Sequence, residues 1–116
     1  FGRVDIIAEG RDYGVYRLRI APGANIPTHV HYQMHEHEMI LGDGILLQNK
    51  PIAAGWAHSW PFDFPHRYDN PTEIEQTILC VDKPPFIPED EVVVEQELGE
   101  LEGVQSDFYY PVESIG

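Results

Sequence analysis

The sequence contains very little cysteine. Its single cysteine, Cys80, has no second thiol in the chain and cannot form an internal disulfide. A lone thiol is compatible with the reducing cytosol, and no signal-like segment opens the chain, so we expect a cytoplasmic protein. Long apolar runs are also missing, since none approaches the roughly 20 residues that span a bilayer. The sequence therefore offers no candidate for a membrane-spanning helix.

Positive charge is scarce as well. The chain carries 20 acidic residues against 7 lysines and arginines, which gives a formal net charge of −13. After Lys83 there is no basic residue, while acidic residues continue as far as Glu113. Such a field repels nucleic acid and anionic membranes, which argues against both as partners. Small neutral, cationic or metal-bound ligands stay compatible with it.

Helical periodicity is hard to find before residue 89. Instead, 10 prolines and 10 glycines separate short runs that have the composition of β-strands. The expected strands are 4–9, 13–20, 36–41, 45–48, 56–64 and 73–82, and the prolines at 61 and 65 make 56–64 an interrupted or edge strand. The Asp43-Gly44 pair predicts a hairpin between 36–41 and 45–48. The 116 residues match the size of one domain, and their pattern predicts an all-β sandwich or barrel.

Histidine is concentrated in one segment. Four of the six histidines lie between His29 and His37, with Glu36 and Glu38 beside them. His29 and His31 are two residues apart, so in an extended strand both rings project from the same face. Neutral imidazole is the commonest protein ligand for divalent transition metals, and a nearby carboxylate adds a further ligand. The segment therefore predicts a metal site.

Two glycine-led motifs resemble those of the cupin superfamily. The first consists of Gly23, five residues, His29-x-His31, four residues and Glu36. The second consists of Gly55, five residues, Pro61-Phe62-Asp63, two residues, His66, three residues and Asn70. The family usually has glycine where this chain has Asp63. Aspartate is one of the few residues that tolerate a left-handed backbone, so we expect the turn to be preserved.

The resemblance implies a fold and a ligand set. It implies one jelly-roll barrel, the double-stranded β-helix of cupins, over residues 1–90, and it leaves 91–116 as an acidic C-terminal extension that packs on the barrel or on a partner subunit. Cupins are often dimeric, so a homodimer is expected. They hold one metal through two histidines and a glutamate of the first motif and a histidine of the second. By position, these ligands are His29, His31, Glu36 and His66. The sequence does not choose among Fe, Mn, Ni, Co and Zn.

The third ligand stays open at the level of sequence. Strand alternation places Glu36 and Glu38 on one face and His35 and His37 on the other. A register shift of one residue, for example through a β-bulge, would swap the two sets and make the site all-histidine. We favour Glu36 because its spacing matches the motif.

Three residues are candidates for catalysis. Whichever of Glu36 and Glu38 does not bind the metal could move a proton. Tyr68 lies two residues after His66 and should share its inward face, where it either lines the cavity or packs as a core aromatic.

Cys80 lies in an apolar strand without a cationic neighbour and is expected to be inert. His58 has no place in either motif.

The ligand count favours an enzyme. Four protein ligands leave one or two positions of the metal open, which distinguishes a catalytic site from a structural one. Cupins that resemble this chain include dioxygenases, decarboxylases, isomerases, lyases and polyketide cyclases, and the fold does not choose among them. We expect a metal-dependent enzyme on a small organic substrate, with dioxygenase chemistry as the leading subclass. The alternatives are a non-catalytic cupin that binds a metabolite or metal, and a structural dimerisation module.

Overall fold

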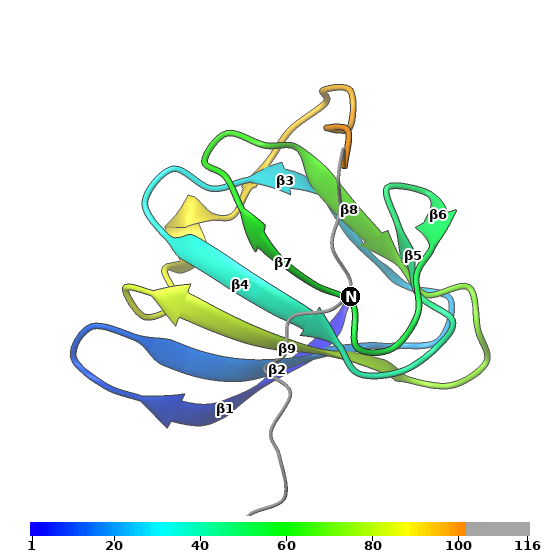
Figure 1. The fold of residues 1–116 in the computed structure, drawn as a ribbon, viewed down its shortest axis with the longest axis horizontal. Helices are drawn as coiled ribbons and strands as arrows, with labels where there is room; N and C mark the ends of the chain where they lie inside the picture. Colours follow the sequence, from blue (N-terminus) through cyan, green and yellow to red (C-terminus); the bar gives the residue numbers. More distant parts are fainter. Residues whose placement is uncertain (102–116) are drawn as a thin grey trace, which may run out of the picture.

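The structure is a computed structural model that describes residues 1–101. Two five-stranded antiparallel sheets pack against each other (Figure 1). The first sheet has the order β1 (Gly2–Glu9), β2 (Gly14–Ile20), β9 (Gln76–Lys83), β4 (His35–Ile40) and β7 (Ala57–Trp60). The second has the order β10 (Val92–Val93), β3 (Asn25–Val30), β8 (His66–Asp69), β5 (Leu46–Leu47) and β6 (Lys50–Pro51). One short 3-10 helix, η1 (Pro88–Asp90), connects β9 to β10.

The space between the sheets is apolar at one end and polar at the other. The apolar end is a cluster of large side chains: Ile20, Ile26, Ile40, Ile45, Leu47, Trp56, Trp60, Tyr68 and Ile78. Along β4 and β9 the inward positions then change character. Ile40 pairs with Ile78, the next inward pair is Glu38 with Cys80, and the last is Glu36 with Asp82. The alternation of β-strands therefore carries three carboxyl groups into the interior.

Each of the six expected strands overlaps a strand of the structure, and the all-β jelly-roll class is confirmed. Strand β8, which carries His66, was not among the expected strands. Strand β7 ends at Trp60, immediately before Pro61, and lies at the edge of its sheet as expected. The predicted hairpin is wrong, because β4 and β5 belong to different sheets. The Asp43-Gly44 pair instead turns the chain from one sheet to the other. Its hydrogen bonds go to distant segments, since the Asp43 carbonyl accepts from Gln76 Nε2 at 2.9 Å.

The first part of the acidic extension packs on the barrel. Strand β10 pairs with β3, so that Val93 lies opposite His29. Gln48 Nε2 donates to the Gly99 carbonyl at 2.8 Å, and Leu101 packs against the apolar core. The rest of the predicted extension, 102–116, lies outside the described residues. Within 1–101, no helix has the length and apolar character needed to cross a bilayer.

Candidate metal centre

Three imidazole rings and one carboxylate meet between the two sheets. His29 lies on β3 and is paired with His66 of β8, His31 follows β3 directly, and Glu36 comes from β4 in the other sheet. The ring centroids of His29 and His66 are 4.2 Å apart, those of His29 and His31 4.9 Å, and those of His31 and His66 5.3 Å. All four side chains are buried, and each offers a ligand atom within 4.8 Å of the others. The structure thus brings the four predicted ligands to one point.

Each ring is fixed from behind by a backbone carbonyl. His29 Nδ1 donates to the carbonyl of Pro27 at 2.8 Å, and His66 Nδ1 donates to that of Phe64 at 2.7 Å. His31 Nδ1 donates to the carbonyl of Asp90 at 3.2 Å. A carbonyl can only accept, so the proton of each neutral ring lies on Nδ1 and the lone pair on Nε2. Carbonyl partners of this kind orient metal-binding histidines and increase their basicity.

The inner nitrogens lack a donor to satisfy them. His31 Nε2 lies 3.0 Å from Glu36 Oε1, and both atoms are acceptors when Nδ1 holds the ring proton and Glu36 is ionised. His66 Nε2 is buried and has no hydrogen-bond partner. Buried acceptors that face one another require a cation or a proton among them. Three imidazole nitrogens and a carboxylate oxygen fit a divalent transition-metal ion.

Burial keeps the three imidazoles neutral. Loss of solvation lowers the pKa of His29 to about 4 and that of His66 to about 2, and it also lowers the pKa of His31. The backbone carbonyls act in the opposite direction but do not cancel the effect of burial. At neutral pH the rings are therefore available as ligands without first losing a proton.

Carboxyl groups surround this centre. Burial, reinforced by Glu38 and Asp82, raises the pKa of Glu36 well above its ordinary value. Burial also raises the pKa of Glu38 to about 7 and that of Glu91 to about 7. Sequence analysis did not single out Asp82 or Glu91. Asp82 could have been found from the alternation of its strand, whereas Glu91 follows a proline-rich turn and carries no periodic signal.

Two aromatic residues hold Glu38 and His66. Glu38 Oε1 accepts a hydrogen bond from Tyr68 OH at 2.9 Å and another from Trp60 Nε1. The Trp60 indole also stacks on the His66 ring, with centroids 4.1 Å apart and planes at 11°. Tyr68 shares the inward face with His66, as the sequence predicts, and both are fully buried. Trp60, which has no fixed place in either motif, thus connects the proposed ligand His66 to Glu38.

The structure places the alternative third ligands away from the rings. Strand β4 pairs with β9 without a bulge from His35 to Ile40, so its alternation is unbroken. His35 is exposed and packs on Phe62, and His37 is exposed and hydrogen-bonds Ser59 Oγ at 2.6 Å. His58 lies between the indoles of Trp56 and Trp60 rather than among the other rings. Glu36 is therefore the β4 side chain that reaches the imidazoles.

The turns of both motifs are shaped as the sequence predicts. Gly23 and Gly55, which open the two motifs, have φ angles of 72° and 89°, a left-handed region that favours glycine. Asp63 has a φ of 56°, so the aspartate does adopt the backbone expected of the family glycine. Asn70, which closes the second motif, donates through Nδ2 to the carbonyls of Ile20 and Ile74. These residues shape the loops that carry the ligands.

Asp90 fixes the loop between β3 and β4. Its carboxylate accepts hydrogen bonds from the backbone N–H groups of Tyr32, Gln33 and Met34 at 2.8–2.9 Å. Its backbone carbonyl accepts the bond from His31 described above. A residue far along the chain therefore holds both the loop that follows His31 and the ring itself.

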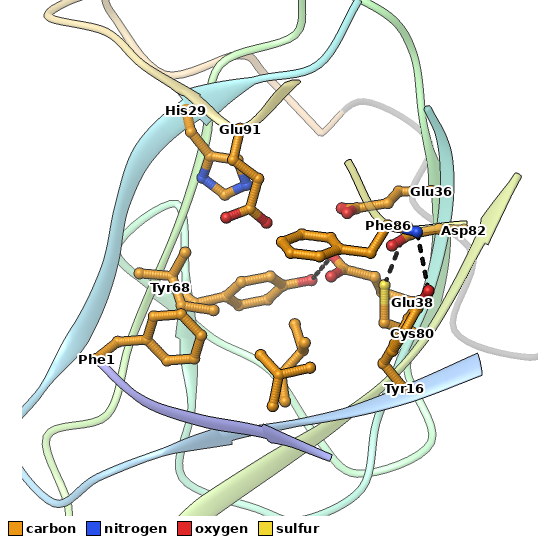
Figure 2. Close-up of a pocket in the computed structure, with 13 residues that line it drawn as sticks. Phe1, Tyr16, His29, Glu36, Glu38, Tyr68, Cys80, Asp82, Phe86 and Glu91 are labelled. Carbon is orange, nitrogen blue, oxygen red and sulfur yellow. Dashed lines mark hydrogen bonds between the residues drawn. The ribbon is translucent and has the colours of Figure 1, made fainter. Parts of the chain in front are cut away.

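A cavity of about 60 Å³ opens beside the metal centre (Figure 2). Figure 2 shows His29 and Glu91 entering it from one side and Glu36, Asp82 and Cys80 from another. The residues that line it are Phe1, Val4, Tyr16, Leu18, Ile26, His29, Glu36, Glu38, Tyr68, Cys80, Asp82, Phe86 and Glu91. All three catalytic candidates, Glu36, Glu38 and Tyr68, therefore face one small space next to the rings.

Comparisons with known proteins support this fold. The sequence matches no protein-family profile and no curated protein. Among solved structures, a sugar phosphate isomerase from the cupin superfamily of Silicibacter pomeroyi is 26% identical with a TM-score of 0.56, and the match covers 62% of this chain and 50% of that protein. The chain thus spans half the length of that relative.

In two further structures the match covers a larger share of the other protein. A cupin domain from Bordetella pertussis is 18% identical over 70% of this chain and 91% of that one, with a TM-score of 0.57. KdgF from Halomonas sp. is 16% identical over 74% of this chain and 80% of that one, with a TM-score of 0.60. Similarities at this level of identity concern the fold, and the chemistry has to be argued from the site.

Proposed function

We propose that this chain, which belongs to the cupin superfamily by its fold and its two motifs, is a metal-dependent enzyme that acts on a small organic molecule. His29, His31, Glu36 and His66 would hold one divalent transition metal. The observation that supports this best is the arrangement of the rings: all three are anchored through Nδ1 and cluster with Glu36, and the buried Nε2 atoms of His31 and His66 have no hydrogen-bond partner.

The metal would supply Lewis-acid chemistry, which polarises a bound oxygen and lowers the pKa of bound water. The protein would supply the proton transfer. Glu38 is buried beside Glu36, and burial raises its pKa to about 7, which is the range in which a carboxyl group serves as a general acid or base at neutral pH. Tyr68 OH orients this carboxylate through its hydrogen bond.

This arrangement favours proton-transfer chemistry, as in an isomerase or lyase. A related structure named as a sugar phosphate isomerase is consistent with that class, although the match spans only half of that protein. The dioxygenase subclass suggested by the resemblance stays a prediction, as do the homodimer and the cytoplasmic location. Turnover in the absence of oxygen would support proton transfer, and turnover that requires oxygen would support the oxygenase.

Elemental analysis of the protein purified without added metal tests the metal site. We expect about one transition-metal ion per chain in the wild type, and nearly none in His31→Ala or His66→Ala, because each substitution removes a ligand. His58→Ala is the matched control, since this histidine is partly buried beside Trp60 but lies outside the ring cluster. If His58→Ala emptied the site as fully as His66→Ala, the ligand assignment would be wrong.

The role of Glu38 needs a separate test. Glu38→Gln keeps the size and one acceptor of the side chain but cannot take up a proton. We expect the variant to retain its metal and to lose turnover on any substrate found by screening. Full activity in Glu38→Gln would exclude this residue as the proton-transfer group. Metal retention with no turnover in the wild type, on any substrate, would favour the non-catalytic binding protein.

A further inference from the structure

We infer that the cavity beside the metal centre accepts a small organic cation, an amine with a short apolar body, and rejects anions. This inference names the ligand class of the proposed function and rests on it. It follows from the charges that line the cavity, from one buried oxygen without a partner, and from the apolar and aromatic walls.

The charged side chains that line the cavity are acidic. Glu36, Glu38, Asp82 and Glu91 line it, and none of the lysines or arginines of the described chain does. One divalent metal ion balances at most two negative charges, and no lysine or arginine lines the cavity to balance a further carboxylate. An anionic ligand would raise the negative charge in a poorly solvated space, whereas a cationic ligand would reduce it.

Asp82 provides an independent indication of a ligand. Its side chain is 1% exposed and lines the cavity, and its Oδ2 atom is buried without a hydrogen-bond partner. The other oxygen, Oδ1, accepts a weak bond from Cys80 Sγ at 3.4 Å. A buried carboxylate oxygen that lacks a donor is costly, and an ammonium group has three donors to offer.

The position of Asp82 adds to this cost. It lies directly opposite Glu36 on the neighbouring strand, with both side chains turned inward. Like charges at opposed positions of adjacent strands destabilise a sheet. A metal on Glu36 would hold that side chain as a carboxylate with no proton to donate, and Asp82, which is outside the ligand cluster, would then have to find a donor for Oδ2 elsewhere. A bound ammonium group at Oδ2 meets that need.

The remaining walls suit the carbon part of an amine. Leu18 and Ile26 form apolar wall, and Figure 2 shows the rings of Phe86 and Tyr68 bordering the same space. Aromatic faces attract cations as well as apolar groups. The volume of about 60 Å³ restricts the ligand to a few non-hydrogen atoms.

The same lining argues against phosphorylated ligands. A phosphate or carboxylate is normally held by arginine, lysine or a row of backbone N–H groups. Neither lysine nor arginine lines this cavity. The chain therefore departs in ligand charge from the related structure whose name is sugar phosphate isomerase.

Three probes of equal size and different charge test the inference. Propylammonium, 1-propanol and propionate are titrated into the protein as purified, after its metal content has been measured, and binding is followed by calorimetry at constant ionic strength. We expect propylammonium to bind at least about tenfold more tightly than 1-propanol, since a hydrogen bond between charged groups is stronger than one to a neutral hydroxyl, and we expect propionate to bind least.

Variants locate the binding. Asp82→Asn and Glu91→Gln should each weaken propylammonium about tenfold and leave 1-propanol unchanged. Glu89→Gln is the control for net charge, because Glu89 is exposed on the same connecting segment, and it should change neither affinity. Circular dichroism checks that each variant folds. If Asp82→Asn does not fold, the comparison of Glu91→Gln with Glu89→Gln tests the inference.

Three results would overturn the inference: propionate or 1-propanol binding as tightly as propylammonium, no binding of propylammonium, or equal effects of Glu91→Gln and Glu89→Gln. Failure of the proposed function would look different. In that case the purified protein would lack metal and would not take it up. The relative affinities of the three probes would still be measured, on the metal-free protein.

Discussion

The neutrality of three imidazoles is the residue-level basis of the proposed metal site. In water a histidine titrates near pH 6.5, and a cluster of three would be partly charged in mild acid. Burial removes that tendency, and the carbonyls of Pro27, Asp90 and Phe64 decide which nitrogen keeps the proton. The site is therefore prepared for a metal by solvation and by backbone geometry.

Metal binding should release protons from carboxyl groups rather than from imidazoles. At pH 6.5 the rings of His29 and His66 are already neutral, because burial lowers the pKa of these histidines to about 4 and about 2. Burial and neighbouring acids raise the pKa of Glu36, so this carboxyl group keeps its proton to a higher pH than an ordinary glutamate, and a metal must displace that proton. Affinity should consequently keep rising as the pH increases through that raised range.

Calorimetry in buffers of different ionisation enthalpy measures the protons released. We expect the wild type to release more protons per metal than Glu36→Gln, whose amide has no proton to lose. Release that is equal in the two proteins would contradict the assignment to Glu36.

Asp63 allows a test of backbone strain at a single residue. Its φ of 56° lies in the left-handed region, where a β-branched side chain is strongly disfavoured. Asp63→Gly should keep or slightly increase the free energy of unfolding, whereas Asp63→Val should lower it by about 1–2 kcal/mol. Urea denaturation of both variants measures the difference, and equal stability would show that the turn relaxes at no cost.

At the level of elements, η1 and the loop between β3 and β4 depend on each other. Asp90 joins them through three charged hydrogen bonds to backbone N–H groups. Burial alone would raise the pKa of Asp90, but these three bonds bring it below its ordinary value of 3.8. The folded state thus favours the carboxylate more than the unfolded state does, and the resulting stability is present above pH 3.8 and disappears as the pH falls below it.

Asp90→Ala should therefore destabilise the protein in a pH-dependent way. At pH 7 we expect a loss of about 1–3 kcal/mol in the free energy of unfolding, because three backbone donors, of which that of Met34 is buried, lose their charged acceptor. The difference between wild type and variant should shrink at pH 3. Urea denaturation at both pH values checks this, with Glu89→Ala as an exposed neighbouring control. A difference that is the same at pH 3 and pH 7 would contradict the role given to the carboxylate.

The elements also show which parts of the fold could be predicted. Alternation of residue types located the main strands and placed Glu36 and Glu38 on one face of β4, because that pattern depends only on local sequence. The hairpin at Asp43-Gly44 was predicted wrongly because its signal, too, depends only on local sequence. A turn signal specifies that the chain reverses, but it does not specify whether the next strand joins the same sheet. In a jelly roll that choice is made by distant pairings, such as that of β5 with β8.

The residues of the site also divide into those that could be predicted from the sequence and those that could not. The motif spacing predicted that His29, His31, Glu36 and His66 would meet, and the structure brings them together. Asp82 and Glu91 were missed because their importance arises only when β9 pairs with β4 and when the segment after η1 returns to β3. The role of Trp60 was missed because it depends on stacking against a residue of another sheet.

At the scale of the whole molecule, the metal should join the two sheets. His29, His31 and His66 belong to one sheet or its adjoining loop, and Glu36 belongs to the other. A metal bound only in the folded state adds about 2.7 kcal/mol of stability at a concentration one hundred times Kd. Removal by a chelator should therefore lower Tm by on the order of 10 °C. Calorimetry before and after chelation measures this, and re-addition of the metal should restore Tm.

The absence of any effect of chelation on Tm would contradict this view of the molecule. His66→Ala provides the matched control, because a protein without the site should show the same Tm with and without chelator. The described chain also contains a second group of potential ligands, Glu36, Glu38 and Cys80. A metal held there would join only strands of one sheet and would include a sulfur ligand.

X-ray absorption spectroscopy of the zinc-loaded protein distinguishes these two sites most directly. We expect three imidazole nitrogens at about 2.0–2.1 Å, at least one oxygen at about 2.0–2.2 Å, and no sulfur. His66→Ala should reduce the imidazole contribution or abolish binding. A sulfur ligand at about 2.3 Å, or fewer than two imidazoles around the metal, would contradict the assignment of the metal to His29, His31, Glu36 and His66.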